Sequence, residues 1–449
     1  MGEISLNRFF KLKEHGTNVK TEIIAGLTTF FAMAYIIFVN PSYLSQAGMD
    51  YTSVLVATCV SAAIGCFLTA FMANVPFAQA PGMGLNAFFT FSVCFGMGYT
   101  WQQALTIVMI SGVLFLAIAV SPIRSKIISS IPAPLKAAIS AGIGLFICFI
   151  GLLNADIVTL FGTVVDEVTG AVTSTDYSDL GAILTSGPAL ALIGVLITGV
   201  LMAWKVKGAM FIGIIATTLI GIPMGLTHAP SSLTENAITL APTLFKFDFG
   251  GLVSHGVLPM ITAIVTFAMC DCFDTVGTLI GTASNAGMLD KDGNLPHGDK
   301  ALVADACATV VGACLGTSTV TTFVESSTGI SEGGRTGLTS VVVGILFLLS
   351  VVFAPIAGII PTQATAPALI IVGMLMIGNV AKIDWSDIEV ALPCFLTIIM
   401  MPFAYSISDG IGFGFISYCV LKIFRGKFKE VPILMYVLSA LFILMYALA

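Results

Sequence analysis

Apolar segments of membrane-spanning length recur from one end of this chain to the other. A helix needs about 20 residues to cross the hydrocarbon core of a bilayer, and such segments fill most of the 449 residues. Only 9% of the residues are charged, whereas a soluble domain carries about 25% to cover its surface. The sequence therefore predicts an all-α polytopic membrane protein. The candidate spans are 22–41, 52–73, 75–97, 101–121, 134–156, 187–203, 208–226, 256–282, 299–316, 318–333, 337–356, 364–381, 388–404, 408–424 and 430–449.

The rest of the composition removes several classes of site and partner. All ten cysteines lie in apolar segments and form no CxxC pair, so we interpret them as small packing residues. We predict no metal site, no cofactor and no enzymatic activity. The net charge of −6 comes with no basic domain, so nucleic acid is not an expected partner.

Basic residues follow the even-numbered spans, where a cytoplasmic N-terminus would place them, because cytoplasmic loops are enriched in Lys and Arg. They are Arg124, Lys126, Lys205, Lys207, Lys291, Lys300, Arg335 and Lys382. The stretch after the fifth span carries Asp156 and Asp179 but no Lys or Arg, as an external loop can. We predict a multi-pass protein of the plasma membrane. Because seven spans are an odd number, a second set of seven would enter from the opposite side, as an inverted repeat.

Two segments in corresponding places, 75–97 and 318–333, make poor helices. The first begins with prolines and the second with Thr and Val, which favour extended backbone. Each becomes compatible with a helix near one polar residue, Asn86 in the first and Glu325 in the second. Lipid-exposed strand is excluded at membrane depth, so such backbone would line an enclosed cavity, and paired interrupted segments indicate a central site. The alternative is that both are ordinary loops.

Ionisable residues inside spans are costly, so each one requires a reason. Asp271, Asp274 and Thr275 are three and four residues apart, so we expect them to share one helical face. Glu325 would stand where strand becomes helix, with the N–H groups of Ser326 and the residue after it free to point into the cavity. The alternative for the aspartates is a buried pair that fixes helix contacts. Asp305 and Asp409 look structural.

Two carboxylates, the Asn86 amide and backbone donors suit a flat heterocycle that carries both N–H donors and ring-nitrogen or carbonyl acceptors. The chain resembles a known family, the nucleobase–ascorbate transporters (NCS2), and within it the AzgA-like adenine, guanine and hypoxanthine permeases. The matching stretches are Gly26–Pro41, Ala80–Ala87, Asp271–Leu279, Gly316–Ile330 and Gly333–Thr339.

The resemblance implies about 14 spans in two inverted seven-span repeats, with short strands in spans three and ten. It implies a core domain formed by 1–130 and 250–358, which moves against a gate domain formed by 131–230 and 359–449. Members of the family are often homodimers that cotransport protons. The segment 430–449 departs from this pattern, because it forms a fifteenth candidate span.

Carried over by residue, the resemblance implies that Asp271, Glu325 and Asn86 contact the substrate, with Ser326 and Thr275 beside them. Asp274 would serve proton coupling or support. No basic residue of the predicted site faces the acids, so we do not expect Asp271 and Glu325 both to stay ionised in an empty cavity.

The predicted function is import of purine nucleobases by proton symport, with hypoxanthine and guanine ahead of adenine. An adenine-preferring permease of the same branch is the first alternative. An anion exchanger of the same fold is the second, although two acids would repel an anion. No GxxxxGK[ST] sequence is present, so ATP-driven transport is not expected.

Overall fold

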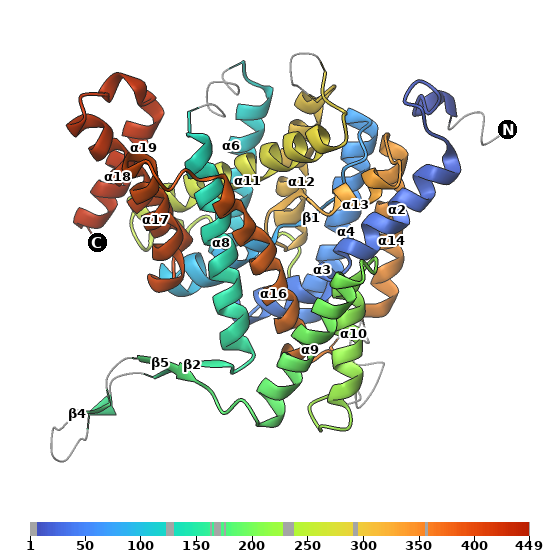
Figure 1. Ribbon diagram of the computed structural model, residues 1–449, viewed down its shortest axis with the longest axis horizontal. Helices are drawn as coiled ribbons and strands as arrows, with labels where there is room; N and C mark the ends of the chain where they lie inside the picture. The colour runs from blue at the N-terminus through green and yellow to red at the C-terminus, as the bar shows by residue number, and fades with distance from the viewer. Residues whose placement is uncertain are drawn as a thin grey trace.

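The computed structural model describes residues 7–122, 130–161, 164–165, 172–174, 177–227, 238–290, 295–354 and 358–448. Helices dominate it (Figure 1). Those of the first half are α2 (Val19–Met33), α3 (Ile36–Leu44), α4 (Tyr51–Leu68), α5 (Met83–Ala87), α6 (Trp101–Val120), α8 (Ala133–Asn154), α9 (Ser186–Ala203) and α10 (Ala209–Gly221). Those of the second half are α11 (Val257–Asn285), α12 (Gly298–Leu315), α13 (Ser326–Ser331), α14 (Gly337–Ser350), α16 (Thr362–Ile377), α17 (Ile388–Phe403), α18 (Ile407–Phe424) and α19 (Ile433–Leu448).

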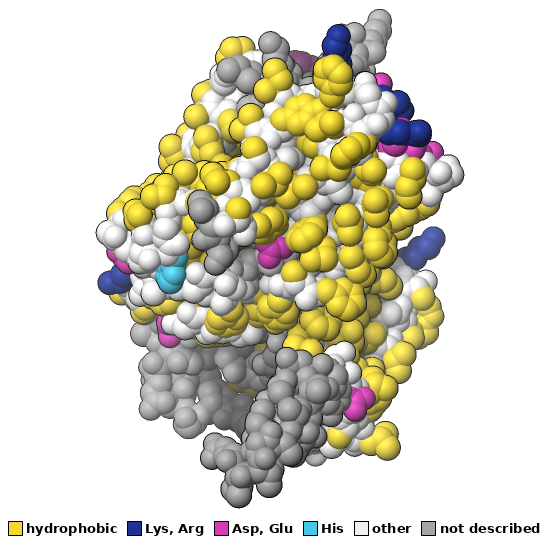
Figure 2. All heavy atoms as spheres, turned by 90° about the vertical axis from the view of Figure 1, so that its left-hand side faces the viewer, with side chains coloured by type: hydrophobic (Ala, Val, Ile, Leu, Met, Phe, Trp, Pro, Cys, Tyr) yellow, Lys and Arg dark blue, Asp and Glu magenta, His cyan; other side chains and the backbone are white. Residues whose placement is uncertain are grey.

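Within the described ranges, eight helices are long and apolar enough to cross a membrane. Large hydrophobic side chains also lie on the outside, among them Phe71, Leu196, Leu219, Leu349 and Phe403. Figure 2 shows hydrophobic side chains spread over one face of the molecule, with the few visible Lys and Arg side chains near its margins. Such a surface is stable against lipid and unfavourable in water. The polytopic membrane class is confirmed.

The helices begin where the local sequence supplies caps. Asp50 accepts a hydrogen bond from the Ser53 amide at the start of α4, and Thr100 and Gln103 form a capping box at the start of α6. Pro132 and Pro361 stand at the N-caps of α8 and α16, where a missing N–H costs nothing.

The packing of the two halves shows the repeat. In the repeat, α2, α4 and α6 correspond to α11, α12 and α14. The contact of α6 with α12 therefore corresponds to the contact of α14 with α4, and the contact of α6 with α11 corresponds to the contact of α14 with α2. Helices α8 and α16 pack on each other along their length. A Cβ added to Gly373 would lie 2.5 Å from the Gly144 carbonyl oxygen, so the two backbones approach at glycines. Exchanging α2–α8 with α11–α16 preserves this pattern, and the predicted inverted-repeat fold is confirmed.

The broken segments contain strands, as predicted. Strands β1 (Gln79–Pro81) and β6 (Val320–Thr322) pair antiparallel, with Gln79 opposite Thr322 and Pro81 opposite Val320. All six residues are buried. Each strand gives the other its backbone hydrogen bonds inside the protein, which is the condition for extended backbone at this depth.

Helix contacts fall mainly into two groups. One contains α2, α4, α6, α11, α12 and α14, and the other contains α8, α9, α10, α16, α17 and α18. The division into a core and a gate domain at the predicted boundaries stays a prediction, and so does their relative motion.

The fifteenth candidate span is a helix. Helix α19 packs on α18 and on α11. Glu430, just before α19, pairs with Lys422 near the end of α18 at 2.9 Å. At the other end, the Tyr446 hydroxyl lies 3.5 Å from the Asp409 carbonyl oxygen at the start of α18. Helix α19 therefore runs antiparallel to α18, as an addition to the repeat.

A hairpin of β2 (Val158–Phe161) and β5 (Tyr177–Leu180) follows α8, and β3 (Val164–Val165) pairs with β4 (Val172–Ser174). It projects beyond the helices at the end opposite the N-terminus (Figure 1). Arg124, Lys126 and Lys291, on which the predicted orientation partly rests, lie outside the described residues.

Candidate functional site

Strands β1 and β6 pair antiparallel, and we call this pair the strand crossing. It brings the two predicted polar junctions, at Asn86 and Glu325, into one region. Beyond the strands, the Gly82 amide donates to the Thr319 carbonyl at 3.0 Å, and the Phe323 amide donates to the Ala78 carbonyl at 3.0 Å. Helix α5 begins just after β1 and α13 begins shortly after β6. Two segments more than 200 residues apart in sequence thus form one unit.

Glu325 stands at the N-cap of α13 with its side chain half-buried. The Tyr35 hydroxyl, from the junction of α2 and α3, donates to Glu325 Oε1 at 2.8 Å. No salt bridge to this carboxylate occurs among the described residues. A carboxylate with one neutral donor has acceptor capacity left for a ligand.

The expected free N–H groups after Glu325 are not present. The Ser326 amide donates to the Phe323 carbonyl at 3.2 Å, and the Ser327 amide donates to the Val324 carbonyl at 3.0 Å. The chain turns tightly before α13 and uses these donors itself, a common way to satisfy a helix start. The Ser326 hydroxyl is also engaged, because it accepts from the Ala78 amide at 3.0 Å.

Asn86 is fully buried. Its carbonyl oxygen accepts a hydrogen bond from the Ser318 hydroxyl, which belongs to the other half of the repeat. Its amide nitrogen lies 3.9 Å from the Met83 sulfur. In this conformation Asn86 joins the two broken segments, and its predicted contact with substrate stays a prediction.

Asp271 points inward from α11 and is 1% exposed. The Thr309 hydroxyl of α12 donates to its Oδ2 at 2.8 Å. Its Oδ1 is buried without a hydrogen-bond partner among the described residues. A buried carboxylate oxygen in this condition is costly, so a ligand or a proton at Oδ1 would stabilise the site.

Asp274 and Thr275 are neighbours on α11 but differ in burial. Thr275 is buried and its hydroxyl lies 2.8 Å from that of Thr321 in β6, whereas Asp274 is exposed. Three residues along a helix turn about 300°, which places Asp274 about 60° from Asp271 on the same side of α11, at its exposed edge.

The pattern of a family described as the permease family matches residues 20–413. The chain belongs to this permease family. The predicted resemblance to nucleobase transporters of the AzgA-like branch is confirmed, and the protein is a transporter rather than an enzyme.

Known permeases match this chain over nearly its whole length. The chain is 43% identical to the guanine/hypoxanthine permease PbuG of Bacillus subtilis, over 98% of this chain and 99% of that one. It is 41% identical to the adenine permease AdeP of Escherichia coli, over 99% and 96%. The transmembrane domain of the cyanobacterial bicarbonate transporter BicA has the same fold, with a TM-score of 0.63 at 17% identity over 87% of this chain and 97% of that domain.

Two polar groups that support the site were missed in the sequence. Asn40 is fully buried and donates to the hydroxyls of Thr58 at 2.6 Å and Thr317 at 2.8 Å. Tyr35 holds Glu325. Both residues lie in the long stretch of family resemblance at Gly26–Pro41, and a polar residue inside an otherwise apolar span was the available signal.

A lysine that packs on α11 was also missed in the sequence. Lys136, in the first turn of α8, is half-buried, and its ammonium lies 5.2 Å from the centroid of the Phe273 ring on α11. Phe273 directly precedes Asp274. This contact is with the ring and not with a carboxylate, so the expectation that no basic residue faces Asp271 and Glu325 stays a prediction.

Asp305, which looks structural in the sequence, contacts the strands with one carboxylate oxygen, while its Oδ2 is buried without a hydrogen-bond partner among the described residues. It is fully buried, and its Oδ1 accepts from Gln79 Nε2 at 3.3 Å and from the Thr322 hydroxyl at 2.7 Å. One carboxylate of α12 therefore contacts both strands of the crossing. Among the described residues no three His, Cys, Asp or Glu side chains are grouped as metal ligands.

Proposed function

We propose that this permease imports purine nucleobases, hypoxanthine and guanine ahead of adenine, by proton symport. The observation that carries the proposal is the half-buried Glu325 carboxylate beside the strand crossing, which has one neutral donor, Tyr35, and no salt bridge among the described residues. The relatives named for guanine/hypoxanthine and for adenine support a purine as cargo.

The chemistry of a purine suits these groups. Its N–H groups can donate to carboxylates, and its ring nitrogens and carbonyl can accept from hydroxyl and amide donors. Glu325 and the α11 acids would accept from the base, while Thr275, Ser326 and Asn86 would complete the site around it. Those three are engaged with protein partners at present, so their use would require a small rearrangement on binding.

Protons are the proposed driving ion because the buried acids have a proton to gain. Asp271 is buried with one unpartnered oxygen, and it forms no salt bridge within the described part of the chain. Burial disfavours the ionised form. A base that donates N–H to the carboxylate changes this balance, so occupancy by proton and by base must influence each other reciprocally.

Uptake into membrane vesicles tests the proposal. An inward proton gradient should drive hypoxanthine above its equilibrium level, a protonophore should abolish the accumulation, and sodium should have no effect. Competition by unlabelled guanine and adenine then ranks the bases. Accumulation that survives the protonophore but collapses without sodium would overturn proton coupling, and absence of purine uptake altogether would overturn the proposed cargo.

An anion exchanger is the second candidate, because BicA has the same fold. The acids at the crossing disfavour an anion there. Bicarbonate uptake in the same vesicles, with no purine uptake, would support this alternative.

Orientation and assembly complete the proposal. We place the protein in the plasma membrane with a cytoplasmic N-terminus, as a homodimer in which the two groups of helices move as core and gate. Tags at the N-terminus and in the β2–β5 hairpin should be accessible from opposite sides of intact cells. Accessibility from the same side would contradict the orientation.

A further inference from the structure

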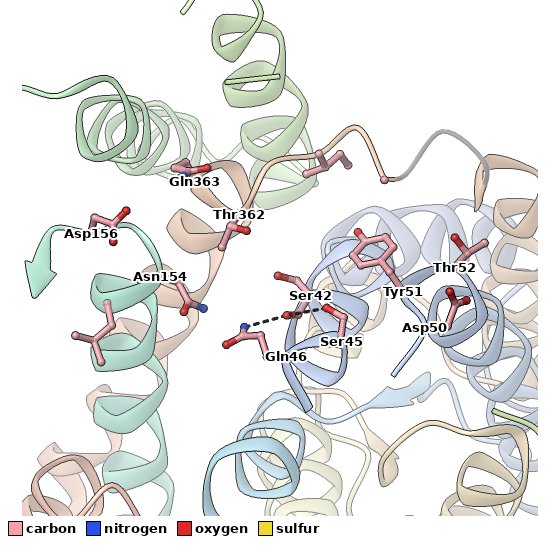
Figure 3. Close-up of a pocket in the computed structure, with 13 residues that line it drawn as sticks. Ser42, Ser45, Gln46, Asp50, Tyr51, Thr52, Asn154, Asp156, Thr362 and Gln363 are labelled. Atoms are coloured by element: carbon pink, nitrogen blue, oxygen red, sulfur yellow. Dashed lines mark hydrogen bonds between the residues drawn. The ribbon is translucent and has the colours of Figure 1, made fainter. Parts of the chain in front are cut away.

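A second polar hollow lies away from the acids. It has a volume of about 710 Å³ and lies where the ends of α3 and α4 face the ends of α8 and α16 (Figure 3). We call it the outer vestibule. Its lining is Ser42, Ser45, Gln46, Asp50, Tyr51, Thr52, Leu153, Asn154, Asp156, Gly358, Ile360, Thr362 and Gln363. Asp271, Asp274, Glu325 and Asn86 are not among these residues, so the vestibule is distinct from the site at the strand crossing.

The position of the vestibule matters for an importer. Asn154 is the last residue of α8, and the β2–β5 hairpin begins four residues later. The vestibule therefore opens on the hairpin side of the molecule, which is the outer side in the proposed orientation. Its walls come from both groups of helices, α3 and α4 on one side and α8 and α16 on the other (Figure 3).

The charges of the vestibule select against anions. Its described lining carries two acids, Asp50 and Asp156, and no Lys or Arg. Asp50 already uses Oδ2 to accept from the Ser53 amide at 2.8 Å and the Ser53 hydroxyl at 2.6 Å. A phosphate or a carboxylate would meet negative charge without a partner, whereas a neutral molecule would not.

Amide side chains supply the recognition chemistry. Gln46 and Asn154 lie on opposite sides of the vestibule, and Gln363 lines its edge beside α9 (Figure 3). The Asn154 amide nitrogen is buried and has no hydrogen-bond partner among the described residues. Gln46 donates to the Ser42 carbonyl at 2.9 Å, which fixes its amide and leaves its oxygen as an acceptor. A carboxamide presents one donor and one acceptor side by side, which matches the edge of a nucleobase.

A flat surface is also available. Tyr51 is half-buried at the start of α4, and its hydroxyl lies 3.5 Å from the Phe38 carbonyl oxygen, so its ring is held in place. Aromatic rings bind the faces of nucleobases by stacking, with little dependence on which base is present.

We propose that the outer vestibule is a first recognition site for the neutral nucleobase, in which Asn154 and Gln363 read its edge before it reaches the acids at the strand crossing. This inference rests on the proposed function and extends it to a second site. The base binds here weakly, between the two groups of helices, and the vestibule sets the rate at which it enters from outside.

Replacing single amides by an alkyl group of similar size tests the proposal. For Asn154→Leu and Gln363→Leu we expect KM for hypoxanthine uptake to rise roughly three- to tenfold, the effect of losing one neutral hydrogen bond. Equilibrium binding of hypoxanthine to the purified protein should stay unchanged, because the site at the crossing is intact. Gln102→Leu is the matched control: Gln102 lies at the start of α6, outside the vestibule lining, and its replacement should leave KM unchanged.

The outcomes separate the two proposals. Normal KM and an unchanged ranking of competing bases in both variants, with purine uptake by the wild type, would overturn the vestibule proposal alone. A changed response to protons or sodium with normal KM would assign the vestibule to a cation and would also overturn it. Absence of purine uptake and binding in the wild type would instead overturn the proposed function. If Asn154→Leu fails to reach the membrane, the Gln363→Leu variant decides, because Gln363 is partly exposed.

Discussion

The two broken segments have the same backbone design but differ in the polar residue at the end of each. Strands β1 and β6 pair with each other and lead into short helices. After β1 comes Asn86, neutral, fully buried and bonded to Ser318. After β6 comes Glu325, acidic, half-buried and bonded only to Tyr35 among its described side-chain partners.

This difference suggests a division of labour between the two halves. A neutral amide can be buried permanently when its hydrogen bonds are made inside the protein. A carboxylate is expensive to bury, so its presence in a membrane span indicates a functional role. We therefore expect changes at Glu325 to affect transport and changes at Asn86 to affect stability.

Glu325→Gln should have the largest effect on transport. Glutamine keeps the size of the side chain but removes the charge and adds a donor where the base also donates. Loss of a charge-assisted hydrogen bond costs about 1.5–3 kcal/mol, or about ten- to a hundredfold in affinity. Binding of labelled hypoxanthine to the purified variant measures this loss.

A matched control is Glu14→Gln, because Glu14 is exposed and pairs with Lys11 at 3.6 Å on the surface. This variant should bind hypoxanthine like the wild type. Wild-type affinity in Glu325→Gln itself would show that the acidic junction does not contact the base, and the contrast between the two segments would lose its functional meaning.

The aspartates of α11 provide the next test, because sequence and structure rank them differently. The sequence assigns the base to Asp271 and coupling to Asp274, so Asp271→Asn should weaken binding without a gradient, and Asp274→Asn should leave more binding but impair accumulation. Exposure favours the reverse, since Asp274 is exposed and Asp271 is 1% exposed. We expect a loss of about tenfold in affinity for whichever residue contacts the base.

Equilibrium binding and proton-driven accumulation, measured on both variants, separate the two assignments. Equal loss of binding in both would mean that the pair acts as one site. Normal binding in both would remove the α11 acids from the base site and leave Glu325 alone in it.

The sequence was sufficient for the class, the repeat and the location of the strands. Lipid imposes simple rules on span length and on extended backbone, and the prolines near Asn86 and the Thr and Val residues before Glu325 follow these rules. What the sequence could not provide is which face each polar group turns to. The exposure of Asp274 differs from that of Asp271 because of how α11 is rotated against its neighbours. Lys136 contacts Phe273 only through the packing of helices that are distant in sequence.

The free N–H groups expected after Glu325 illustrate a second limit. A helix start leaves donors unsatisfied in general, but the local turn decides whether they face a ligand or a carbonyl of the same chain. Here Ser326 and Ser327 donate to Phe323 and Val324. No residue type in this stretch distinguishes the two arrangements in advance.

Asn86→Ala should mainly reduce stability. It removes the acceptor of the Ser318 hydroxyl and leaves that group buried without a partner, which costs about 1–3 kcal/mol. Thermal unfolding of the purified protein should show a lower midpoint, and Asn86→Ala combined with Ser318→Ala should recover part of the loss, because both partners are then removed. A weaker affinity for hypoxanthine with an unchanged unfolding midpoint would instead support the predicted contact between Asn86 and the substrate.

Tyr35→Phe should have the smallest effect of the series. The variant keeps the ring and removes the hydroxyl that donates to Glu325 at 2.8 Å. Glu325 is half-buried and can turn to water in part, so we expect only about a two- to fivefold rise in the Kd for hypoxanthine, from a less well oriented carboxylate. Tyr436→Phe is the control, because Tyr436 is a tyrosine of α19 whose hydroxyl donates to the Phe428 carbonyl, far in sequence from the strand crossing.

The decisive measurement for Tyr35 is a double-mutant cycle with Glu325→Gln. If Tyr35 acts only by positioning the Glu325 carboxylate, Tyr35→Phe should have little further effect once that carboxylate is gone, so the two losses should not add. Additive losses would mean that the Tyr35 hydroxyl contacts the base directly. In that case the acidic junction would include a residue from the first span, and the two broken segments would differ not only in charge but also in how many elements contribute to each.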